Sequence, residues 1–153
     1  MTGLMAEDLN FSKEDWVRLI RSLQDDICFA LEGEDGNAKF MEDNWVREGG
    51  GGGRTRVIQN GGVFEKGGVN TSVVEGEVTD VMRQQLHIEG DHWFAAGISI
   101  VLHPLNPFVP AIHCNYRMFE LYNIDSGFSN RWFGGGTDLT PFIFLMKMYA
   151  IFI

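Results

Sequence analysis

The spacing of apolar residues near the start of the chain is that of a helix. Between Ser12 and Leu31, apolar positions recur at steps of three and four residues, which predicts an amphipathic helix with one buried face. Ser12 followed by Asp15 has the spacing of a capping box, so the helix is expected to begin there. Two glycines then favour a stop, and the segment from Glu32 to Asn37 is predicted to be a polar loop.

Beyond this helix, the spacing changes to the alternation that is typical of β-strands. Short segments rich in β-branched and aromatic residues are separated by glycine pairs, and a short helix is expected from Thr79 to Leu86. The expected strands cover residues 54–59, 69–74, 93–102, 111–121 and 130–133. The connection between the two longest strands, HPLNPFVP, holds three of the four prolines, so it is expected to be stiff, extended and outside either strand.

These elements predict an α+β fold, with a large, mostly antiparallel sheet flanked by α-helices. No repeat or linker divides residues 1–153, so we expect a single domain. The segment 141–153, PFIFLMKMYAIFI, is an atypical apolar tail that is too short to cross a bilayer, which takes about 20 residues. We favour a core-facing segment whose partner is missing over an interfacial anchor. The first residues lack the pattern of a signal or transit peptide, which favours a cytoplasmic protein.

Composition narrows the possible functions. The chain carries 12 Lys and Arg against 21 Asp and Glu, with a formal net charge of −9. A protein of this charge lacks the positive field that draws proteins to nucleic acid, so nucleic acid is not expected as a partner. Cys28 and Cys114 lie far apart without a metal-binding spacing, which favours a reducing compartment over a disulfide framework.

Glycine is over-represented, with 19 of 153 residues, and much of it falls in runs. The run at 47–54, REGGGGGR, is a poor match to a phosphate loop, because no Gly-Lys-Ser/Thr follows and the next segment is a predicted strand. Such runs indicate bulges, positive φ angles or the close approach of a flat ligand to the main chain. The second run, WFGGGTDLTP, places Asp138 just after three glycines, where a tight loop would carry its carboxylate into a buried site. The alternative is a turn residue or a helix cap.

Alternation places candidate chemistry on one face of two strands. His113, Asn115 and Arg117 point to one side of their strand, and Ser99 and His103 share a side of the preceding one. If the proline linker folds these strands back on each other, the five side chains form a surface that suits an anionic, carboxylate-bearing ligand. The alternative is an ordinary solvated strand face in which His103 caps a strand end. Two histidines alone are too few for a zinc site.

Three long segments resemble a known family. They are NWVREGGGGGRTRVIQNGGVFEKGGVNTSVVEGE, FAAGISIVLHPLNPFVPAIHCNYRMFE and WFGGGTDLTPF, and together they run from about Asn44 to Phe142. These segments resemble the oxygen-dependent coproporphyrinogen III oxidases. The resemblance implies a haem-pathway enzyme that uses dioxygen as co-substrate to decarboxylate two propionates of coproporphyrinogen III to vinyl groups, giving protoporphyrinogen IX. It also implies a homodimer with a broad antiparallel sheet flanked by helices and no organic cofactor.

The resemblance also assigns roles to individual residues. The implied substrate contacts are Ser99, Asn115, Tyr116 and Arg117. His113 is implied to be the proton donor, and the carboxylate of Asp138 is implied to interact with the pyrrole N–H groups. Bacterial relatives are assigned a divalent metal bound by four histidines, of which His103 and His113 match the first two, whereas eukaryotic relatives are usually treated as metal-free. The segment from Val69 to Val78 resembles one associated with dimerisation.

The last part of the chain departs from the family pattern. Family members are longer, and after DLTP they continue into an acidic, histidine-bearing helix, whereas here the apolar tail carries neither an acid nor a histidine. The other two histidines of the metal site and part of the active-site enclosure therefore have no counterpart. Two hypotheses follow: an oxygen-dependent oxidase, or a truncated, catalytically inactive remnant that at most binds porphyrinogen or pairs with a full-length subunit.

Overall fold

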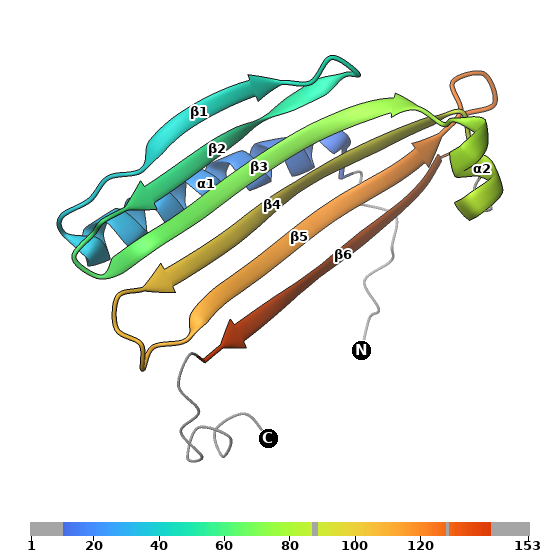
Figure 1. The fold of residues 1–153 in the computed structure, drawn as a ribbon. Coiled ribbons are helices and arrows are strands. Elements are labelled where there is room, and N and C mark those ends of the chain that lie inside the picture. Colours follow the sequence, from blue (N-terminus) through green and yellow to red (C-terminus); the bar gives the residue numbers. More distant parts are fainter. Residues whose placement is uncertain (1–10, 87–88, 128, 142–153) are drawn as a thin grey trace, which may run out of the picture.

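The computed structural model describes residues 11–86, 89–127 and 129–141, which form a single sheet with two helices. In chain order the elements are α1 (Lys13–Asp35), β1 (Met41–Val46), β2 (Gly51–Gln59), β3 (Phe64–Glu77), α2 (Asp80–Leu86), β4 (His92–Pro104), β5 (Ala111–Tyr122) and β6 (Ser129–Thr140). The strands follow one another in space in the same order as in the sequence, and each runs antiparallel to its neighbours. The predicted α+β fold with a mostly antiparallel sheet is confirmed (Figure 1).

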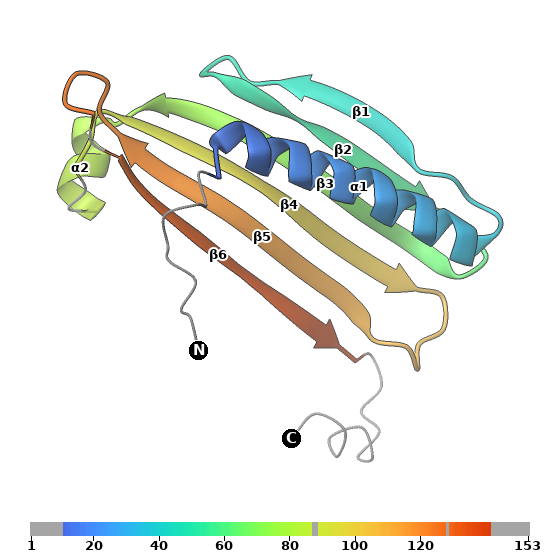
Figure 2. The ribbon, with the colours of Figure 1, turned by 180° about the vertical axis from the view of Figure 1, so that it is seen from behind.

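The long helix α1 covers only one side of this sheet. Seen from behind, it lies over the strands and runs close to their direction, while α2 lies at the end where β3 leads into β4 (Figure 2). No described helix covers the opposite side of the sheet, which we call the open face. None of the described helices is long and apolar enough to cross a membrane.

The hydrophobic core lies between α1 and the three central strands. Its buried members come from α1, β3, β4 and β5, and they are Ile20, Cys28, Val69, Phe94, Ala96, Ile98 and Met118. Burial of a large apolar side chain of this kind stabilises a fold by about 1.5–3 kcal/mol, so this cluster fixes which face of each strand points to the helix. Burial also raises the pKa of the Cys28 thiol.

One fully buried polar side chain sets the position of α1 on the sheet. The amide of Gln24 donates hydrogen bonds to the carbonyl oxygens of Arg54 (2.8 Å) and Val69 (2.7 Å). Its oxygen accepts from Arg54 Nε (2.7 Å) and Thr71 Oγ1 (3.1 Å). A buried amide without hydrogen-bond partners would reduce the free energy of unfolding by about 1–3 kcal/mol. The helix is therefore held where β2 and β3 supply these partners.

The ends of the helices agree partly with the sequence prediction. The capping box of Ser12 and Asp15 is confirmed, and Thr79 Oγ1 accepts a hydrogen bond from the backbone N–H of Met82, as expected for a helix cap. The predicted polar loop at 32–37 is wrong over most of its length, because α1 continues to Asp35. The helix stops only at Gly36, whose φ of 71° is the left-handed conformation that glycine favours.

The strands are longer than predicted, and this changes the place of both glycine runs. Gly51–Gly53 lie inside β2 and Gly134–Gly136 inside β6, so the predicted tight loop before Asp138 is wrong: the residue is part of a strand. His103 and Pro104 likewise belong to β4, and the rest of the proline-rich connection is a turn closed by a hydrogen bond from Val109 N to Asn106 O, so it is not extended. Glycine reduces strand propensity, but hydrogen bonding compensates, from β1 and β3 for the run in β2 and from β5 for the run in β6. The predicted apolar tail lies outside the described residues from position 142 onward.

The C-terminus of α1 is tied to the β2–β3 hairpin by a buried carboxylate. Asp35 accepts hydrogen bonds from the backbone N–H groups of Phe64 (3.0 Å), Ala38 (2.8 Å), Val63 (3.0 Å) and Gly62 (3.0 Å). These backbone hydrogen bonds hold the pKa of the Asp35 carboxyl well below its usual range. The charged carboxylate of Asp35, which accepts hydrogen bonds from several backbone amides, therefore anchors this end of the helix.

Asp35→Asn is predicted to lower the free energy of unfolding, because a neutral amide accepts more weakly and turns its NH₂ group toward backbone donors. Since the folded-state pKa of Asp35 is depressed, its contribution is fully present above the unfolded-state pKa of about 4 and is lost progressively as the pH falls from there through the folded-state pKa. Urea unfolding should show the full difference between the two proteins at about pH 7 and a smaller difference at about pH 3. Asp26→Asn, an exposed change on the same helix, is the control, and a difference that does not depend on pH would contradict this account.

Candidate active site

The open face brings together most of the residues singled out in the sequence. The pairing of β4 with β5 places Ser99 opposite Asn115, and the pairing of β5 with β6 places His113 opposite Asp138. Residues directly opposite each other in adjacent strands point to the same side of the sheet, so these four side chains share the open face. Arg117, two positions after Asn115, lies on the same face opposite Gly97, and the predicted common surface is confirmed.

A histidine and a carboxylate form the chemically most distinctive pair on this face. His113 Nδ1 lies 3.5 Å from Asp138 Oδ2, and that oxygen also accepts a hydrogen bond from Thr140 Oγ1 (2.6 Å). The ring of His103 meets that of His113 edge-on, with the ring centroids 6.2 Å apart. The side chains of His113 and Asp138 are 42% and 66% exposed, so both are accessible to a ligand. A histidine beside a carboxylate suits proton transfer.

The hollow around this pair is broad and shallow, with a volume of about 390 Å³. It is lined by residues of β4, β5 and β6, among them Ser99, His113, Asn115 and Asp138. Its β6 side includes Gly136, and a Cβ atom built at Gly136 or Gly134 would meet no described atom within 4 Å. Packing among the described residues therefore does not require glycine at these two positions, whereas close approach of a flat ligand would.

A second, smaller hollow of about 80 Å³ adjoins the first and contains the cation of the site. Arg117 forms one side, Ser99 and Asn115 are shared with the larger hollow, and Gly97 lies between these side chains. Trp45 lies across Gly53 and makes the far wall, because a Cβ at Gly53 would come within 2.3 Å of its ring. A guanidinium surrounded by hydroxyl and amide groups is a suitable receptor for a carboxylate.

Asn70 is a member of this site that the sequence pattern did not indicate. Asn70 lies on β3 directly opposite Ser99 and lines the smaller hollow. Its Oδ1 is buried and accepts no hydrogen bond from any residue in the described part of the chain. Buried acceptors without a partner are uncommon in proteins, so this oxygen is available to a donor on a ligand. Strand alternation would have placed Asn70 on the open face, but the predicted strand 69–74 was not aligned with its neighbours.

Tyr116 is the one predicted substrate contact that lies elsewhere. Its side chain points to the α1 side of β5, where its hydroxyl lies 2.9 Å from Thr137 Oγ1, and it is 46% exposed. Alternation requires this placement, because Asn115 and Arg117 on either side of it face the opposite way. The structure therefore groups Ser99, Asn115 and Arg117 together and separates Tyr116 from them by the thickness of the sheet.

The described residues do not complete a metal site. His103 and His113 lie next to each other, but within residues 11–86, 89–127 and 129–141 no group of three or more His, Cys, Asp or Glu side chains could hold a metal ion. Bound zinc takes three protein ligands at a catalytic site and four at a structural one. The donor set of the described residues therefore does not fit a metal, and no step of the chemistry below is assigned to one.

The segment that resembles a dimerisation segment lies largely within the sheet. Its residues 69–77 belong to β3, and this strand is hydrogen-bonded to β2 on one edge and to β4 on the other. A second chain therefore cannot pair with it as an added strand. Any contribution to a dimer interface has to come from its side chains, such as those of Asn70, Ser72 and Val74 on the open face.

Comparison with known proteins identifies the family. The profile of the family described as coproporphyrinogen III oxidase matches residues 15–152. Relatives named oxygen-dependent coproporphyrinogen-III oxidase include those of Prochlorococcus marinus strains MIT 9515 and MIT 9312, which are 49% and 47% identical over 141 residues. These alignments cover 91% of this chain and 40% of each relative.

A third relative of the same name, from Synechococcus sp. strain CC9605, is 48% identical over 133 residues, which is 86% of this chain and 35% of the relative. The chain thus spans about two fifths or less of the length of the curated relatives that it matches. Residues 15–152, which the family profile matches, include the glycine-lined face with its Arg117 cation and its His113–Asp138 pair. The chain belongs to the coproporphyrinogen III oxidase family.

Proposed function

We propose that the open face binds coproporphyrinogen III and supports its oxygen-dependent conversion to protoporphyrinogen IX. The observation that carries this proposal is that the Arg117 guanidinium and the His113–Asp138 pair lie on the same glycine-lined face, which the described helices leave free. Coproporphyrinogen III presents carboxylates at its rim and pyrrole N–H groups at its centre. The open face offers a cation for the former and a carboxylate for the latter.

The proposed reaction removes one propionate carboxylate at a time and needs two such rounds. In each round the propionate and one dioxygen, with one proton, give a vinyl group, carbon dioxide and hydrogen peroxide. The substrate side chain loses two electrons, and dioxygen accepts them. The C–C bond to the carboxylate breaks, and its electron pair forms the vinyl double bond. The side-chain carbon attached to the pyrrole ring loses a hydrogen together with its bonding electron pair, and these are the two electrons that dioxygen accepts.

The side chains of the open face have separate tasks in this scheme. Arg117 holds a propionate carboxylate, and Ser99 and Asn115 orient it with neutral hydrogen bonds. Asp138 accepts a pyrrole N–H, which raises the electron density of the ring that reacts with dioxygen. His113, 3.5 Å from Asp138, exchanges the proton that the reaction consumes. The structure supports these tasks through placement, and Tyr116 has no task on this face.

The alternative proposal is a catalytically inactive chain that binds porphyrinogen or pairs with a longer subunit. The alignments cover 40% of each matched relative, and a shared fold does not by itself establish a shared reaction. The two proposals agree on ligand binding and differ on turnover. An assay that measures both quantities on the same sample therefore separates them.

Asp138→Ala and Asp138→Asn are each predicted to reduce turnover by about 100-fold or more, since positioned acid–base groups contribute factors of this size. The assay first measures anaerobic binding of coproporphyrinogen III and then admits air and follows the vinyl products. Asp43→Asn, a carboxylate change on the open face of β1, is the matched control and should retain turnover. Undiminished turnover in the Asp138 variants would remove the residue from the mechanism, and binding without turnover in the unaltered chain would favour the inactive alternative.

Gly136→Val is predicted to leave stability unchanged or slightly raised, because a Cβ atom at this position meets no described atom within 4 Å and valine favours strands. The same change should weaken coproporphyrinogen III binding roughly tenfold by occupying the space that the ring needs. Gly33→Ala, on the exposed side of α1, is the control for replacing a glycine without affecting the open face. Thermal unfolding measures the first quantity and equilibrium dialysis the second. Equal binding by the valine variant would show that the ligand does not approach β6.

A further inference from the structure

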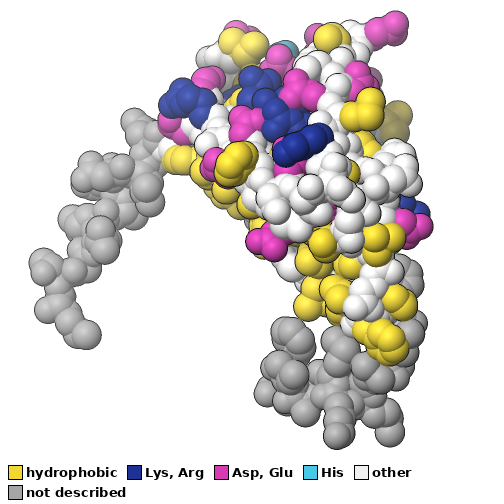
Figure 3. Space-filling view, turned by 90° about the vertical axis from the view of Figure 1, so that its left-hand side faces the viewer, with side chains coloured by type: hydrophobic (Ala, Val, Ile, Leu, Met, Phe, Trp, Pro, Cys, Tyr) yellow, Lys and Arg dark blue, Asp and Glu magenta, His cyan; other side chains and the backbone are white. Residues whose placement is uncertain are grey.

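Most basic side chains of the described residues are already paired. On the α1 side of the sheet, Arg54 and Arg56 form ion pairs with Asp25 and Glu42. Figure 3 shows basic and acidic side chains interspersed on the side of the molecule that faces the viewer. Arg131 is paired with Glu120 in the same way on β6. These cations are neutralised within the protein, so they are poor receptors for an anionic ligand.

Three basic side chains among the described residues have no such partner. No ion pair or hydrogen bond joins the side chain of Arg21, Lys66 or Arg117 to another residue in the part of the chain that the structure describes. Arg21 is exposed on α1, away from the open face. The other two both belong to the sheet, Lys66 on β3 and Arg117 on β5. Cations on one face that are left without internal partners are positioned for charges from outside the protein.

Lys66 lies on the open face at the far end of the same line of hollows. It is directly opposite His103 in the pairing of β3 with β4, so the two side chains point the same way. Together they line a hollow of about 460 Å³ whose other residues include Gly68 and Val101. Glu65 also borders this hollow but makes no ion pair with Lys66 among the described contacts.

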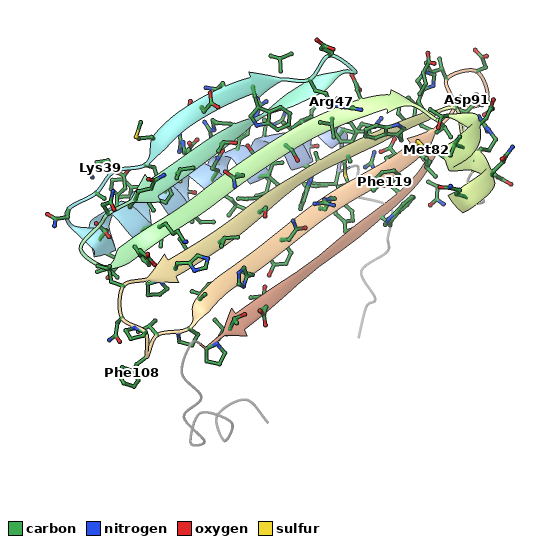
Figure 4. All side chains as sticks on the ribbon, in the orientation of Figure 1. Lys39, Arg47, Met82, Asp91, Phe108 and Phe119 are labelled. Atoms are coloured by element: carbon green, nitrogen blue, oxygen red, sulfur yellow. The ribbon has the colours of Figure 1, made fainter. Side chains whose placement is uncertain are left out.

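The three hollows adjoin one another across the open face. The Lys66 hollow and the His113–Asp138 hollow share Val101, and the latter shares Ser99 and Asn115 with the Arg117 hollow. Figure 4 views this side of the sheet from the front, and its one labelled strand residue, Phe119, lies beyond Arg117 toward the α2 end of β5. A single ligand that covers the central pair therefore has a cation near each of its opposite sides.

The distance between the two cations excludes a single carboxylate as their common ligand. Gly97, opposite Arg117, and His103, opposite Lys66, are six residues apart on β4, which is about 20 Å along a strand. The cations are also two strand spacings apart, about 10 Å across the sheet. Even with both long side chains leaning inward, one propionate cannot reach both. Carboxylates on opposite sides of a tetrapyrrole can, because its four propionates are distributed around the whole ring.

We propose that Lys66 binds a second carboxylate of the tetrapyrrole, on the side of the ring away from Arg117, and thereby selects ligands that carry carboxylates on both sides. This inference rests on the proposed function, since it concerns the same ligand. It makes Lys66 a specificity-determining residue rather than a catalytic one. The ammonium group holds the far rim of the ring while the reacting propionate lies near the His113–Asp138 pair.

Two ligands that differ only in their carboxylates test the proposal. Coproporphyrinogen III carries four propionates, whereas mesoporphyrinogen IX has ethyl groups in place of the two on one side of the ring. Dissociation constants of both are measured anaerobically by equilibrium dialysis for the unaltered chain and for Lys66→Met, Lys66→Arg and Arg21→Met. Thermal unfolding of each variant confirms that it is folded. Arg21→Met removes an unpaired cation that is not on the open face.

Lys66→Met should weaken binding of coproporphyrinogen III roughly fivefold and leave that of mesoporphyrinogen IX within about twofold, a size expected for one exposed ion pair. Lys66→Arg should restore the affinity, and Arg21→Met should change neither ligand. An unchanged affinity for coproporphyrinogen III in Lys66→Met, or an equal loss for both ligands, would overturn the inference while leaving the proposed function intact. If the unaltered chain binds neither ligand, the proposed function fails and the inference fails with it.

Discussion

The open face exists because α1 packs on only one side of the antiparallel sheet, and the buried Gln24 amide determines where. Gln24 satisfies its donors and its acceptor on β2 and β3, and the apolar residues around it bury against β3, β4 and β5. With one face of each strand committed to this core, alternation sends every second side chain to the other side. On β4 and β5, the residues that come directly before and after core residues in the sequence therefore point to the open face, and they include the polar residues of the candidate site. A shift of one residue in any strand would exchange core and site, which is why the register is so strongly specified.

The charge distribution follows the same division of the sheet. The protein is acidic overall, with a formal net charge of −9, yet we propose that it binds an anion. On the α1 side, basic residues are neutralised by neighbouring carboxylates, as Arg56 is by Asp25 and Glu42. On the open face, Arg117 and Lys66 keep their charge available. Net charge therefore says little about this ligand, because affinity depends on which cations remain unpaired and where they lie.

Much of the fold and part of the site could be predicted from the sequence, for identifiable reasons. Apolar spacing gives the helix that begins at Ser12, and alternation gives the shared face of His113 and Asn115, because both signals are local. The predicted lengths of β2 and β6 are too short, because the glycine runs inside them weaken the local strand signal, whereas pairing with β1 and β3 in one case and with β5 in the other holds these residues in the sheet. Asp138 was expected in a loop for the same reason.

The pairing between strands distant in sequence could not be predicted without register. Asn70 and Lys66 join the site only because β3 is aligned with β4, which places them opposite Ser99 and His103. The unpaired state of Lys66 is likewise a property of three-dimensional neighbours, not of spacing. Tyr116 shows the converse: adjacent to two residues of the site in sequence, it lies on the other side of the sheet.

The central claim, that the tetrapyrrole binds on the open face and not on the α1 side, can be tested with the indole N–H signals of the four tryptophans. Trp45 borders the Arg117 hollow on the open face, whereas Trp16 lies on the α1 side and donates its indole N–H to the carbonyl of Ala96 (2.8 Å). Nuclear magnetic resonance spectra are recorded during anaerobic titration with coproporphyrinogen III, with each signal assigned by a Trp→Phe substitution. The account predicts a large, saturable shift of the Trp45 signal and an unchanged Trp16 signal. A shift of Trp16 with Trp45 unmoved would contradict it.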